Sequence, residues 1–394
     1  MTISSLVITL NGFAEEPRSG GHIRLDNTVA GLLSLGSVDY FAVSDRPKRH
    51  VDTDQIRVLE VERPPRASRC RSREIAWLPS ELRGWRNAVT RQALEGWRRP
   101  SYDLVWYSHV SSYYAVEVPL PSCTIVDLDN LEDRKCWQRV GLGLTSRRLS
   151  DLRPVGGAAV DALRWRRLQR RCSARVSCVT VCSTCDAKRL GLRNVAVLEN
   201  GCVVTSPGGG HSVGRSPNVL LVGDFNYEPN RDAARFALNE VMPLVRSALP
   251  DARLRLVGRG SSAFRGYAGR AVELVGEVAD ISMEYKEAAV VLAPVRVGSG
   301  TRLKIIEALG YGIPVVATRV AADGLAVEDG IHLLLHNGAG NLARGVVTLC
   351  EDLALREKLS SEGRARFLER YTHEHARRAT AAIARSVPAR RSTA

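Results

Sequence analysis

Short apolar runs alternate with helical patterns along the whole chain. In the first half of the chain the runs are 6–10, 38–43, 103–107, 123–128, 176–182 and 195–200. In the second half they are 218–223, 253–258, 271–276, 290–295, 314–319 and 332–335. Near-continuous Val, Ile and Leu between helical segments is typical of parallel strands that are buried on both faces. The alternation therefore predicts an α/β protein built on doubly wound sheets.

A stretch rich in Gly, Pro and Ser at 201–217 divides these runs into two sets, each sufficient for a Rossmann-like domain. We expect an N-terminal domain over 1–200, a linker over 201–217, a C-terminal domain over 218–372, and a helix and tail over 373–394 that can pack back on the first domain. A second irregular stretch, 141–160, is expected to be a mobile loop. Because ligands of such sheets bind at the carboxyl ends of the strands, two facing domains imply a cleft.

The most informative segment, 288–320, combines a strand, a loop of small residues and a helix. The loop carries Gly298, Ser299 and Gly300, and the helix starts near Thr301. Small residues let the backbone approach a ligand closely, and the first N–H groups of a helix have no partner within it. Together these features describe an anion site.

Two charged residues follow on the same helix. Lys304 lies one turn in, and Glu307 follows three residues later on the same face. A lysine suits a phosphate, and a carboxylate accepts hydrogen bonds from ribose hydroxyls, so the pair describes a nucleoside diphosphate. On spacing alone, an ordinary strand–loop–helix with a surface Lys–Glu pair explains the segment equally well.

The stretch PVRVGSGTRLKIIEALGYGIPVVAT, 294–318, resembles the donor-site signature of family-4 retaining glycosyltransferases (glycosyl transferases group 1), which have the GT-B fold. The resemblance covers about 218–372, with further matches at LLVGDFNYEPNRDAARF, LPDARLRLVGRG and VELVGEVADI. It is looser in the first half, at SGGHIRLDNTVAGL, YDLVWYSH and VDLDNLEDRK. It implies two Rossmann-like domains facing across a cleft.

The resemblance also implies an activity: a sugar is moved from a nucleotide diphosphate of the UDP or GDP type to a hydroxyl or amine acceptor. The reaction would proceed with retention and without a metal, as a hexosyltransferase. The Arg-rich composition suits natural-product (antibiotic) or cell-surface polysaccharide biosynthesis. The nucleotide sugar is a co-substrate, and no cofactor is expected. The implied donor-binding residues are Gly20, Gly21, Gly223, Arg259, Val278, Gly298, Ser299, Gly300, Thr301, Arg302, Lys304 and Glu307.

Lys304, Glu307 and His109 are the implied catalytic residues. Lys304 and the helix N-terminus would stabilise charge on the departing diphosphate. His109 stands where the family often has a histidine near the donor sugar, and a strand-end histidine bound to local backbone is an equal alternative. Asp127 and Asp129, just past a strand, are expected to face the acceptor rather than to bind a metal.

Two positions depart from the family pattern. Ser299 stands where the family's Glu–seven residues–Glu motif has its first Glu, so sugar contacts must come from other groups. Asp224 replaces an arginine that often follows the first strand of the second domain. Phosphate charge then rests on Lys304, with Arg302 or an N-domain arginine such as Arg24 as helpers. The nucleotide, sugar and acceptor are left open.

The formal net charge of +14 is compatible with nucleic acid, anionic membrane or phosphorylated ligands. Six arginines lie on the predicted helix 161–175, whose apolar stripe includes Trp165 and Cys172. This helix permits peripheral docking on an anionic membrane, although a solvated face is the commoner outcome. The six tryptophans do not interleave with basic residues, so no nucleic-acid partner is expected. The oligomeric state is not predicted.

The chain has no apolar run of about 18 residues, and its first residues read as a strand rather than a signal peptide. A cytoplasmic location is therefore expected, with peripheral membrane contact open. Cys178, Cys182 and Cys185 have the spacing of radical enzymes that bind an iron–sulfur cluster, but valines interleave with them. Buried thiols are the favoured interpretation.

Three other functions compete with that of a glycosyltransferase. A nucleotide-sugar epimerase or phosphorylase would use the same fold, but its catalytic acids or cofactor lysine cannot be placed in this sequence. An NAD-dependent oxidoreductase is disfavoured because LNGFAEEPRSGG, without G-x-G-x-x-G, follows the first strand. A non-catalytic nucleic-acid or membrane binder is suggested by charge alone.

Overall fold

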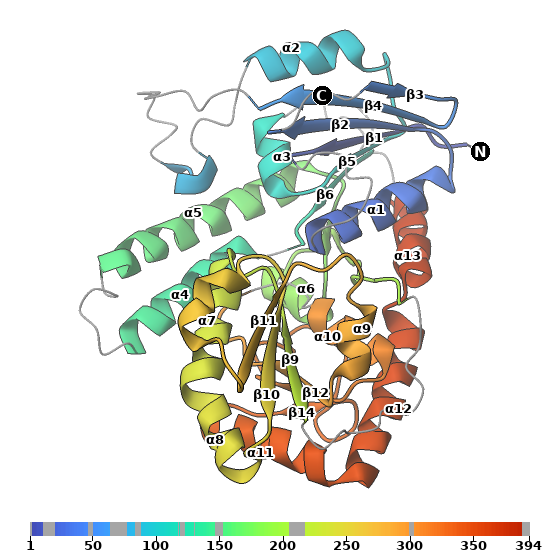
Figure 1. Cartoon of the computed structure of the whole chain (residues 1–394). Coiled ribbons are helices and arrows are strands. Elements are labelled where there is room, and N and C mark those ends of the chain that lie inside the picture. The colour runs from blue at the N-terminus through green and yellow to red at the C-terminus, as the bar shows by residue number, and fades with distance from the viewer. Residues whose placement is uncertain are drawn as a thin grey trace. The chain divides into compact units, whose positions relative to one another are not determined.

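The computed structural model describes residues 2–10, 20–45, 50–63, 77–82, 88–116, 118, 123–129, 131–145, 153–204, 217–298 and 303–387. The chain divides into two compact units, which are described separately (Figure 1). Unit 1 comprises Met1–Asn200 together with His373–Ala394, and unit 2 comprises Gly201–Thr372.

Unit 1 contains an eight-stranded sheet with the order β3-β4-β2-β1-β5-β6-β7-β8. Its strands are β1 (Ser5–Thr9), β2 (Val38–Ser44), β3 (His50–Asp52), β4 (Ile56–Glu62), β5 (Leu104–Tyr107), β6 (Cys123–Asp127), β7 (Cys178–Val181) and β8 (Val195–Val197). The pairings are parallel, except that β3 runs antiparallel to β4. The chain builds outward from β1 in one direction and from β5 in the other. The strand order therefore reverses between these two neighbours, which is where ligands of doubly wound sheets bind.

Helices cover both faces of this sheet. They are α1 (Gly20–Leu33), α2 (Ala88–Trp97), α3 (Val110–Ala115), α4 (Glu132–Thr145), α5 (Arg153–Arg175), α6 (Thr184–Leu190) and α13 (His373–Ser386), with a short 3-10 turn η2 (Ser80–Leu82). Val7 of β1 points into the core beneath α1 and α13. Its neighbours Leu6 and Ile8 point into the core beneath α2 to α5. Because β1 is buried on both faces, its sequence is an unbroken apolar run.

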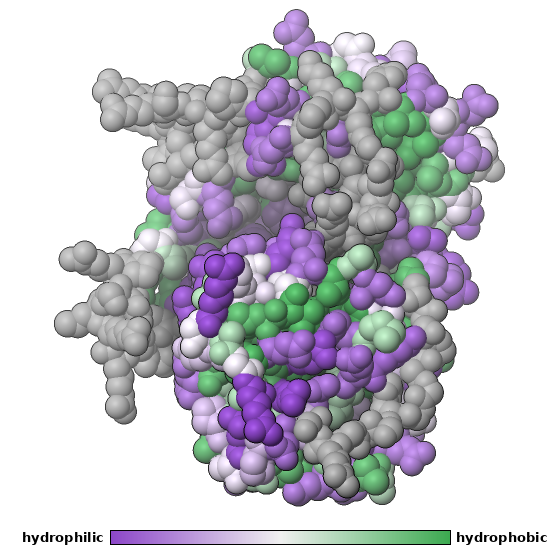
Figure 2. All heavy atoms as spheres, in the orientation of Figure 1, coloured by the Kyte–Doolittle hydropathy of each residue, from purple (hydrophilic) through white to green (hydrophobic). Residues whose placement is uncertain are grey.

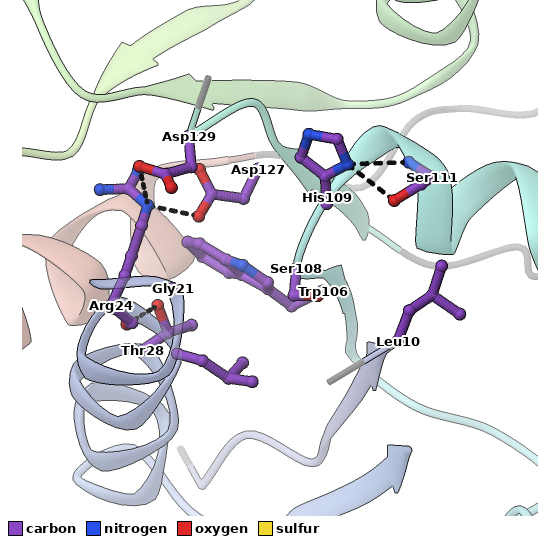
Figure 3. A pocket seen from close by; sticks show the side chains of 11 residues that line it. Leu10, Gly21, Arg24, Thr28, Trp106, Ser108, His109, Ser111, Asp127 and Asp129 are labelled. Carbon is purple, nitrogen blue, oxygen red and sulfur yellow. Dashed lines mark hydrogen bonds and ion pairs between the residues drawn. The ribbon is translucent and has the colours of Figure 1, made fainter. Parts of the chain in front are cut away.

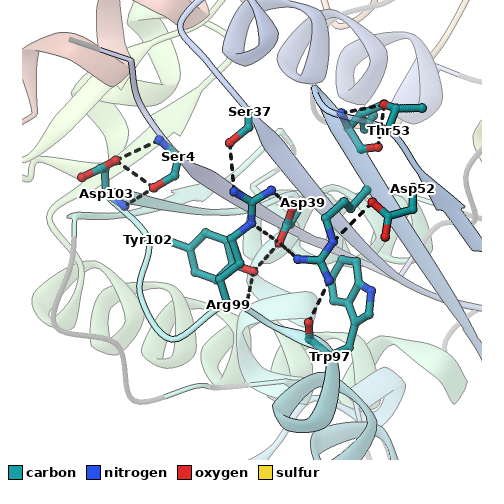
Figure 4. A network of polar contacts seen from close by, with 11 residues as sticks. Ser4, Ser37, Asp39, Asp52, Thr53, Trp97, Arg99, Tyr102 and Asp103 are labelled. Atoms are coloured by element: carbon teal, nitrogen blue, oxygen red, sulfur yellow. Dashed lines mark hydrogen bonds and ion pairs between the residues drawn. The ribbon is translucent and has the colours of Figure 1, made fainter.

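A polar network stabilises the amino ends of the strands in unit 1 (Figure 4). Asp39 of β2 is buried and lies opposite Arg57 of β4 in the strand register. Arg57 donates to Asp39 Oδ2 at 3.0 Å, Arg99 donates to both carboxylate oxygens at 3.1 and 3.0 Å, and the Tyr102 hydroxyl donates at 2.6 Å. Two arginines and a tyrosine thus satisfy one buried carboxylate, at the end of the sheet opposite the carboxyl ends of the strands.

Unit 2 contains a six-stranded parallel sheet with the order β11-β10-β9-β12-β13-β14. Its strands are β9 (Asn218–Val222), β10 (Arg253–Val257), β11 (Val272–Gly276), β12 (Val290–Ala293), β13 (Val315–Ala317) and β14 (Leu334–Leu335). Its helices are α7 (Glu228–Phe236), the π-helix η4 (Ala237–Val241), α8 (Met242–Ala248), the 3-10 helix η5 (Ser261–Tyr267), α9 (Ser282–Glu287), α10 (Leu303–Tyr311), α11 (Ala339–Glu351) and α12 (Leu353–Arg370). Figure 1 shows α7 and α8 on one side of the sheet and α9, α10 and α12 on the other. The strand order reverses between β9 and β12.

The predicted α/β fold with two doubly wound parallel sheets is confirmed, and two local expectations need correction. Strands β3 and β4 were not predicted, because β4 carries Arg57, Glu60 and Glu62 among its apolar residues. The mobile loop expected at 141–160 is wrong for its described residues, which belong to the helices α4 and α5. Gly156 and Gly157 made the stretch look irregular, but they lie within α5.

The described residues of the linker are 201–204 and 217, which the structure assigns to unit 2. Its Cys202 forms an isolated parallel bridge with Thr372, so the two ends of unit 2 lie side by side. Figure 2 shows hydrophilic side chains over much of the described surface visible in that view, with apolar side chains in smaller groups. This distribution is ordinary for a folded surface.

Candidate functional site

The strand-order reversal in unit 2 lies where the anion site was expected. Gly223 follows β9, and the loop after β12 reaches Gly298, whose φ of 142° is in the region that favours glycine. Helix α10 then begins at Leu303. The predicted donor-binding residues Ser299, Gly300, Thr301 and Arg302 lie outside the described residues.

Lys304 points from the first turn of α10 toward the end of β9. Its Nζ donates to Asn230 Oδ1 at 2.9 Å, and Asn230 Nδ2 donates to the Asp224 carbonyl at 3.0 Å. A Cβ added at Gly223 would lie 3.2 Å from Lys304 Nζ and 3.0 Å from the Asn230 amide. The lysine and the asparagine therefore occupy space that a glycine leaves open.

Glu307 lies one turn further along α10 and is half-buried. The hydroxyl of Tyr285, a buried residue of α9, donates to Glu307 Oε2 at 2.8 Å. Burial raises the pKa of Glu307, and the Tyr285 hydrogen bond and the charge of Lys304 both oppose that rise. Burial also raises the pKa of Tyr285 well above its ordinary value, and the nearby Glu307 adds to the effect. Tyr285 is thus a hydrogen-bond donor at neutral pH.

The other predicted donor-side residues lie after neighbouring strands. Arg259, after β10, pairs with Asp224, after β9, with Nη2 and Oδ2 2.8 Å apart. Asp224 thus stands where the family often has an arginine, and its ion pair holds a different arginine, Arg259, at the same edge of the sheet. A Cβ added at Gly258 would lie 2.1 Å from the Gly223 carbonyl oxygen, so this close approach requires glycine. Val278 lies half-buried in the loop after β11.

The strand-order reversal in unit 1 holds a cavity of about 280 Å³ (Figure 3). Its walls come from the ends of β1, β5 and β6 and from the first turns of α1. The lining residues are Leu10, Gly21, Arg24, Leu25, Thr28, Trp106, Ser108, His109, Ser111, Asp127 and Asp129. Of the predicted residues, the structure brings together Gly21, His109, Asp127 and Asp129 here, while Gly20 is the exposed first residue of α1.

Asp127 and Arg24 form a buried ion pair on one side of this cavity. Arg24 Nε and Nη2 donate to the two carboxylate oxygens at 2.6 and 2.7 Å. Arg24 Nη1 donates to Asn200 Oδ1 and the Leu198 carbonyl, and Thr180 donates to Asp127 Oδ1 at 2.7 Å. Burial lowers the pKa of Arg24, but the charge and hydrogen bonds of Asp127, with smaller contributions from Asp129 and Cys182, raise it above its ordinary value. Arg24, proposed above as a phosphate helper, is therefore neutralised by Asp127.

Asp129 is a second carboxylate beside the same arginine. Its Oδ1 lies 3.7 Å from Arg24 Nε and accepts from Asn200 Nδ2 at 3.3 Å. Burial raises its pKa, and Arg24 reduces this rise. Since Arg24 already binds Asp127 at shorter distances, Asp129 is the less well compensated of the two carboxylates.

His109 is the N-cap residue of α3. Its Nδ1 accepts the backbone N–H of Ser111 at 3.2 Å, so the proton of the neutral ring is on Nε2. Nε2 lies 3.9 Å from Glu132 Oε1. The two interpretations of this histidine therefore use different nitrogens: Nδ1 is bound to local backbone, and Nε2 is a donor beside the cavity.

Three residues at these sites were not predicted. Asn230 belongs to the stretch LLVGDFNYEPNRDAARF, whose resemblance to the family assigned no role to this asparagine. Tyr285 had no signal beyond the apolar side of a short helix. Glu132 follows the aspartates by a few residues and faces His109 because the two residues follow β6 and β5, which are neighbours in the sheet.

The three cysteines with cluster-like spacing lie in different environments. Cys178 is buried in β7, Cys182 donates to the Asp129 carbonyl at 3.1 Å, and Cys185 is exposed on α6. Among the described residues, no group of three His, Cys, Asp or Glu side chains could hold a metal ion. Within the described part of the chain, no helix has the length and hydropathy needed to cross a bilayer.

Comparison with known proteins confirms the resemblance to glycosyl transferases group 1. Residues 216–352, almost all of unit 2 up to the end of α11, match the model of that family. The phosphatidyl-myo-inositol mannosyltransferase of Mycobacterium leprae is 31% identical over 161 residues, which cover 39% of this chain and 42% of the relative. A Klebsiella pneumoniae relative is covered over 38% of its length, so the chain matches about two fifths of the curated relatives.

Solved structures support the fold along the whole chain. Sucrose-phosphate synthase from Thermosynechococcus elongatus superposes with a TM-score of 0.72 at 18% identity, covering 98% of both chains. HepE from Anabaena, solved in complex with UDP-glucose, superposes with a TM-score of 0.63 at 14% identity, covering 98% of this chain and 100% of HepE. The two parallel-sheet units match those of GT-B glycosyltransferases.

Proposed function

We propose that this protein is a retaining glycosyltransferase that uses a nucleoside diphosphate sugar of the UDP or GDP type. The observation that carries the proposal is the pair Lys304 and Glu307, one turn apart on α10, at the strand-order reversal of a unit whose sequence matches glycosyl transferases group 1. The Anabaena HepE complex contains UDP-glucose, which supports a UDP donor.

Lys304 and the amino end of α10 bind the diphosphate in this proposal. Both stabilise negative charge as it develops on the leaving group, and both are held before the substrate arrives. Asn230 positions the lysine by accepting a hydrogen bond from Nζ. Glu307 accepts hydrogen bonds from the ribose hydroxyls.

The cavity of unit 1 supplies polar contacts to the sugar and the acceptor. His109 Nε2–H is a donor, and Asp129 is an acceptor for a hydroxyl or amine. Both oxygens of Asp127 already accept hydrogen bonds from the protein, so Asp127 is not assigned as a covalent nucleophile.

The bond from the anomeric carbon to the diphosphate oxygen breaks, and its electron pair leaves with the diphosphate. The acceptor oxygen or nitrogen forms its bond on the same face of the sugar, and its proton passes to the departing phosphate oxygen. This route requires no side-chain nucleophile and no metal ion.

We also propose a peripheral contact with anionic membranes through the exposed arginines of α5, which are Arg166, Arg167, Arg170, Arg171 and Arg175. Trp77 is 64% exposed, and the Arg167 guanidinium carbon lies 5.0 Å from its ring centroid. Leu163, on the same helix, is 58% exposed. Arginines beside exposed apolar side chains suit a membrane interface, which would fit a cell-surface glycan pathway.

Product analysis tests the transfer reaction. The protein is incubated with UDP-glucose or GDP-mannose and a panel of hydroxyl and amine acceptors, and nucleoside diphosphate release is followed. The proposal predicts acceptor-dependent release of UDP or GDP and a product with the donor's anomeric configuration by proton NMR. An inverted product would contradict retention, and absence of transfer to every acceptor would contradict the activity.

A further inference from the structure

Tyr285 connects the two helices at the nucleotide site of unit 2. It belongs to α9, a helix of six residues, and its side chain is fully buried. Its ring stacks on Tyr311, the last residue of α10, with 4.8 Å between centroids and 16° between planes. Its hydroxyl reaches the other end of the same helix, 2.8 Å from Glu307 Oε2 and 3.4 Å from the Lys304 carbonyl oxygen.

Because the Tyr285 hydroxyl donates this hydrogen bond, the contact affects both the charge and the orientation of the Glu307 side chain. A tyrosine hydroxyl can donate one hydrogen bond, and an ionised carboxylate can only accept. The contact therefore favours the ionised form of Glu307 and restricts its rotation. Without it, a half-buried carboxylate beside the apolar core would more readily take up a proton and could turn away from the ligand.

We propose that Tyr285 is a positioning residue for Glu307: it holds Oε2, and Oε1 is thereby directed to the vicinal 2′- and 3′-hydroxyls of the nucleotide ribose. This inference rests on the proposed function, because it requires a nucleotide at α10. It makes Tyr285, a residue without ligand contact, a determinant of the preference for ribose over deoxyribose.

The property that Tyr285 should affect is the discrimination ratio, which is the ratio of the affinity for UDP or GDP to the affinity for the corresponding 2′-deoxy analogue. A carboxylate held with two hydroxyls in front of it loses a hydrogen bond when the 2′-hydroxyl is absent, so UDP or GDP binds more tightly than its 2′-deoxy analogue. A carboxylate that is protonated or rotated cannot make this distinction. Loss of the Tyr285 hydroxyl should therefore weaken UDP more than dUDP.

A purely structural tyrosine predicts a different result. Tyr285→Phe removes one oxygen and keeps the ring that stacks on Tyr311, so a core role alone would leave both the discrimination ratio and its pH dependence unchanged. Tyr267→Phe is a matched control, because Tyr267 lies in the same unit and its hydroxyl donates to Asn239 at 2.9 Å.

The experiment is calorimetric titration of the full chain with UDP and dUDP, or with GDP and dGDP, at pH 7.5 and pH 5.5. The variants are Tyr285→Phe, Glu307→Gln and Tyr267→Phe, and thermal melting checks that each is folded. We expect Tyr285→Phe to weaken UDP binding by about 5- to 10-fold at pH 5.5 and by less at pH 7.5, because its Glu307 protonates more readily. Its UDP-to-dUDP ratio should fall toward one.

Glu307→Gln keeps the tyrosine and its packing and should lose the same discrimination, which provides the test if the phenylalanine variant does not fold. A ratio and pH profile in Tyr285→Phe equal to those of wild type and Tyr267→Phe would overturn the positioning role while leaving the nucleotide site intact. An unchanged ratio in Glu307→Gln would overturn it as well. Failure of the wild-type chain to bind any nucleoside diphosphate would instead overturn the proposed function and this inference with it.

Discussion

Arg24 and Asp127 form a two-pronged ion pair across 103 residues of sequence, with N–O distances of 2.6 and 2.7 Å and both side chains buried. The pair connects α1 to the end of β6 at the strand-order reversal of unit 1. It holds one wall of the cavity in place. His109 and Asp129, which also line the cavity, are less tightly held by this pair. The first two predictions follow from this arrangement.

Asp127→Asn should destabilise unit 1 strongly. The substitution leaves Arg24 charged and buried without its partner, which typically costs about 3–5 kcal/mol. The midpoint of urea unfolding, followed by circular dichroism, measures the effect. Asp45→Asn is the control, because Asp45 also pairs with an arginine but its side chain is 73% exposed; it should cost under about 1 kcal/mol. Equal effects of the two substitutions would contradict the role of the buried pair.

The contribution of Asp129 to protein stability should depend on pH with the opposite sign to that of a carboxylate whose pKa is lowered by folding. Burial raises its pKa above the ordinary 3.8, so the folded state holds the proton more tightly than the unfolded state. The associated stability is present below the unfolded pKa and is lost as pH rises through the folded pKa. Asp129→Asn should therefore raise the melting temperature relative to wild type at pH 7 and not at pH 4. A variant less stable than wild type at pH 7 would refute this assignment.

Asn230 is predicted to act on phosphate binding through Lys304. Asn230→Ala removes the acceptor 2.9 Å from Nζ, so the ammonium is no longer held in one position. We expect affinity for a nucleoside diphosphate to fall by about 10-fold or more, since one hydrogen bond to a charged group contributes about 1.5–3 kcal/mol, with little change for the free nucleoside. Asn239→Ala, remote from Lys304 in the same unit, is the control. Equal losses for both ligands would show that Asn230 acts on the fold rather than on the phosphate.

We expect the protein to bind anionic vesicles through the exposed arginines of α5. Arg170→Glu with Arg171→Glu should reduce sedimentation with phosphatidylglycerol vesicles by about 10-fold or more, since each basic residue near such a surface contributes about 1 kcal/mol. Arg378→Glu with Arg385→Glu makes the same charge change on exposed positions of α13 and should have a smaller effect. Equal binding to phosphatidylcholine vesicles, or equal losses in both double variants, would refute a membrane contact through α5.

The fold was predictable because its central strands are buried on both faces. Leu6, Val7 and Ile8 are completely inaccessible to solvent, and such strands appear in the sequence as unbroken apolar runs. Strand β4 lies nearer the edge and carries Arg57 and Glu60, whose partners come from other elements, so its pattern resembled that of a loop. Gly156 and Gly157 made the start of α5 look like a loop in the same way, although they are exposed positions within a long helix that packs along α4.

The candidate site was predictable as far as it depends on local sequence. Lys304 and Glu307 are three residues apart on one helix, and helical geometry alone places them on one face. Their partners are distant: Asn230 lies 74 residues from Lys304, and Tyr285 lies 22 residues from Glu307. Such pairings depend on which helices follow which strands around the sheet, and spacing in the sequence does not encode them.

In the proposed function, Lys304 and Glu307 bind a nucleoside diphosphate. Calorimetric titration of the chain with UDP, GDP, TDP and ADP, with NAD as a control ligand, tests it most directly when repeated on Lys304→Ala and Glu307→Ala. Lys358→Ala and Glu357→Ala, at exposed positions of α12, are the matched controls. We predict that one nucleoside diphosphate binds and that its affinity falls by about 10-fold or more in both site variants, but not in the controls. Absence of binding, or binding indifferent to both site variants, would contradict it.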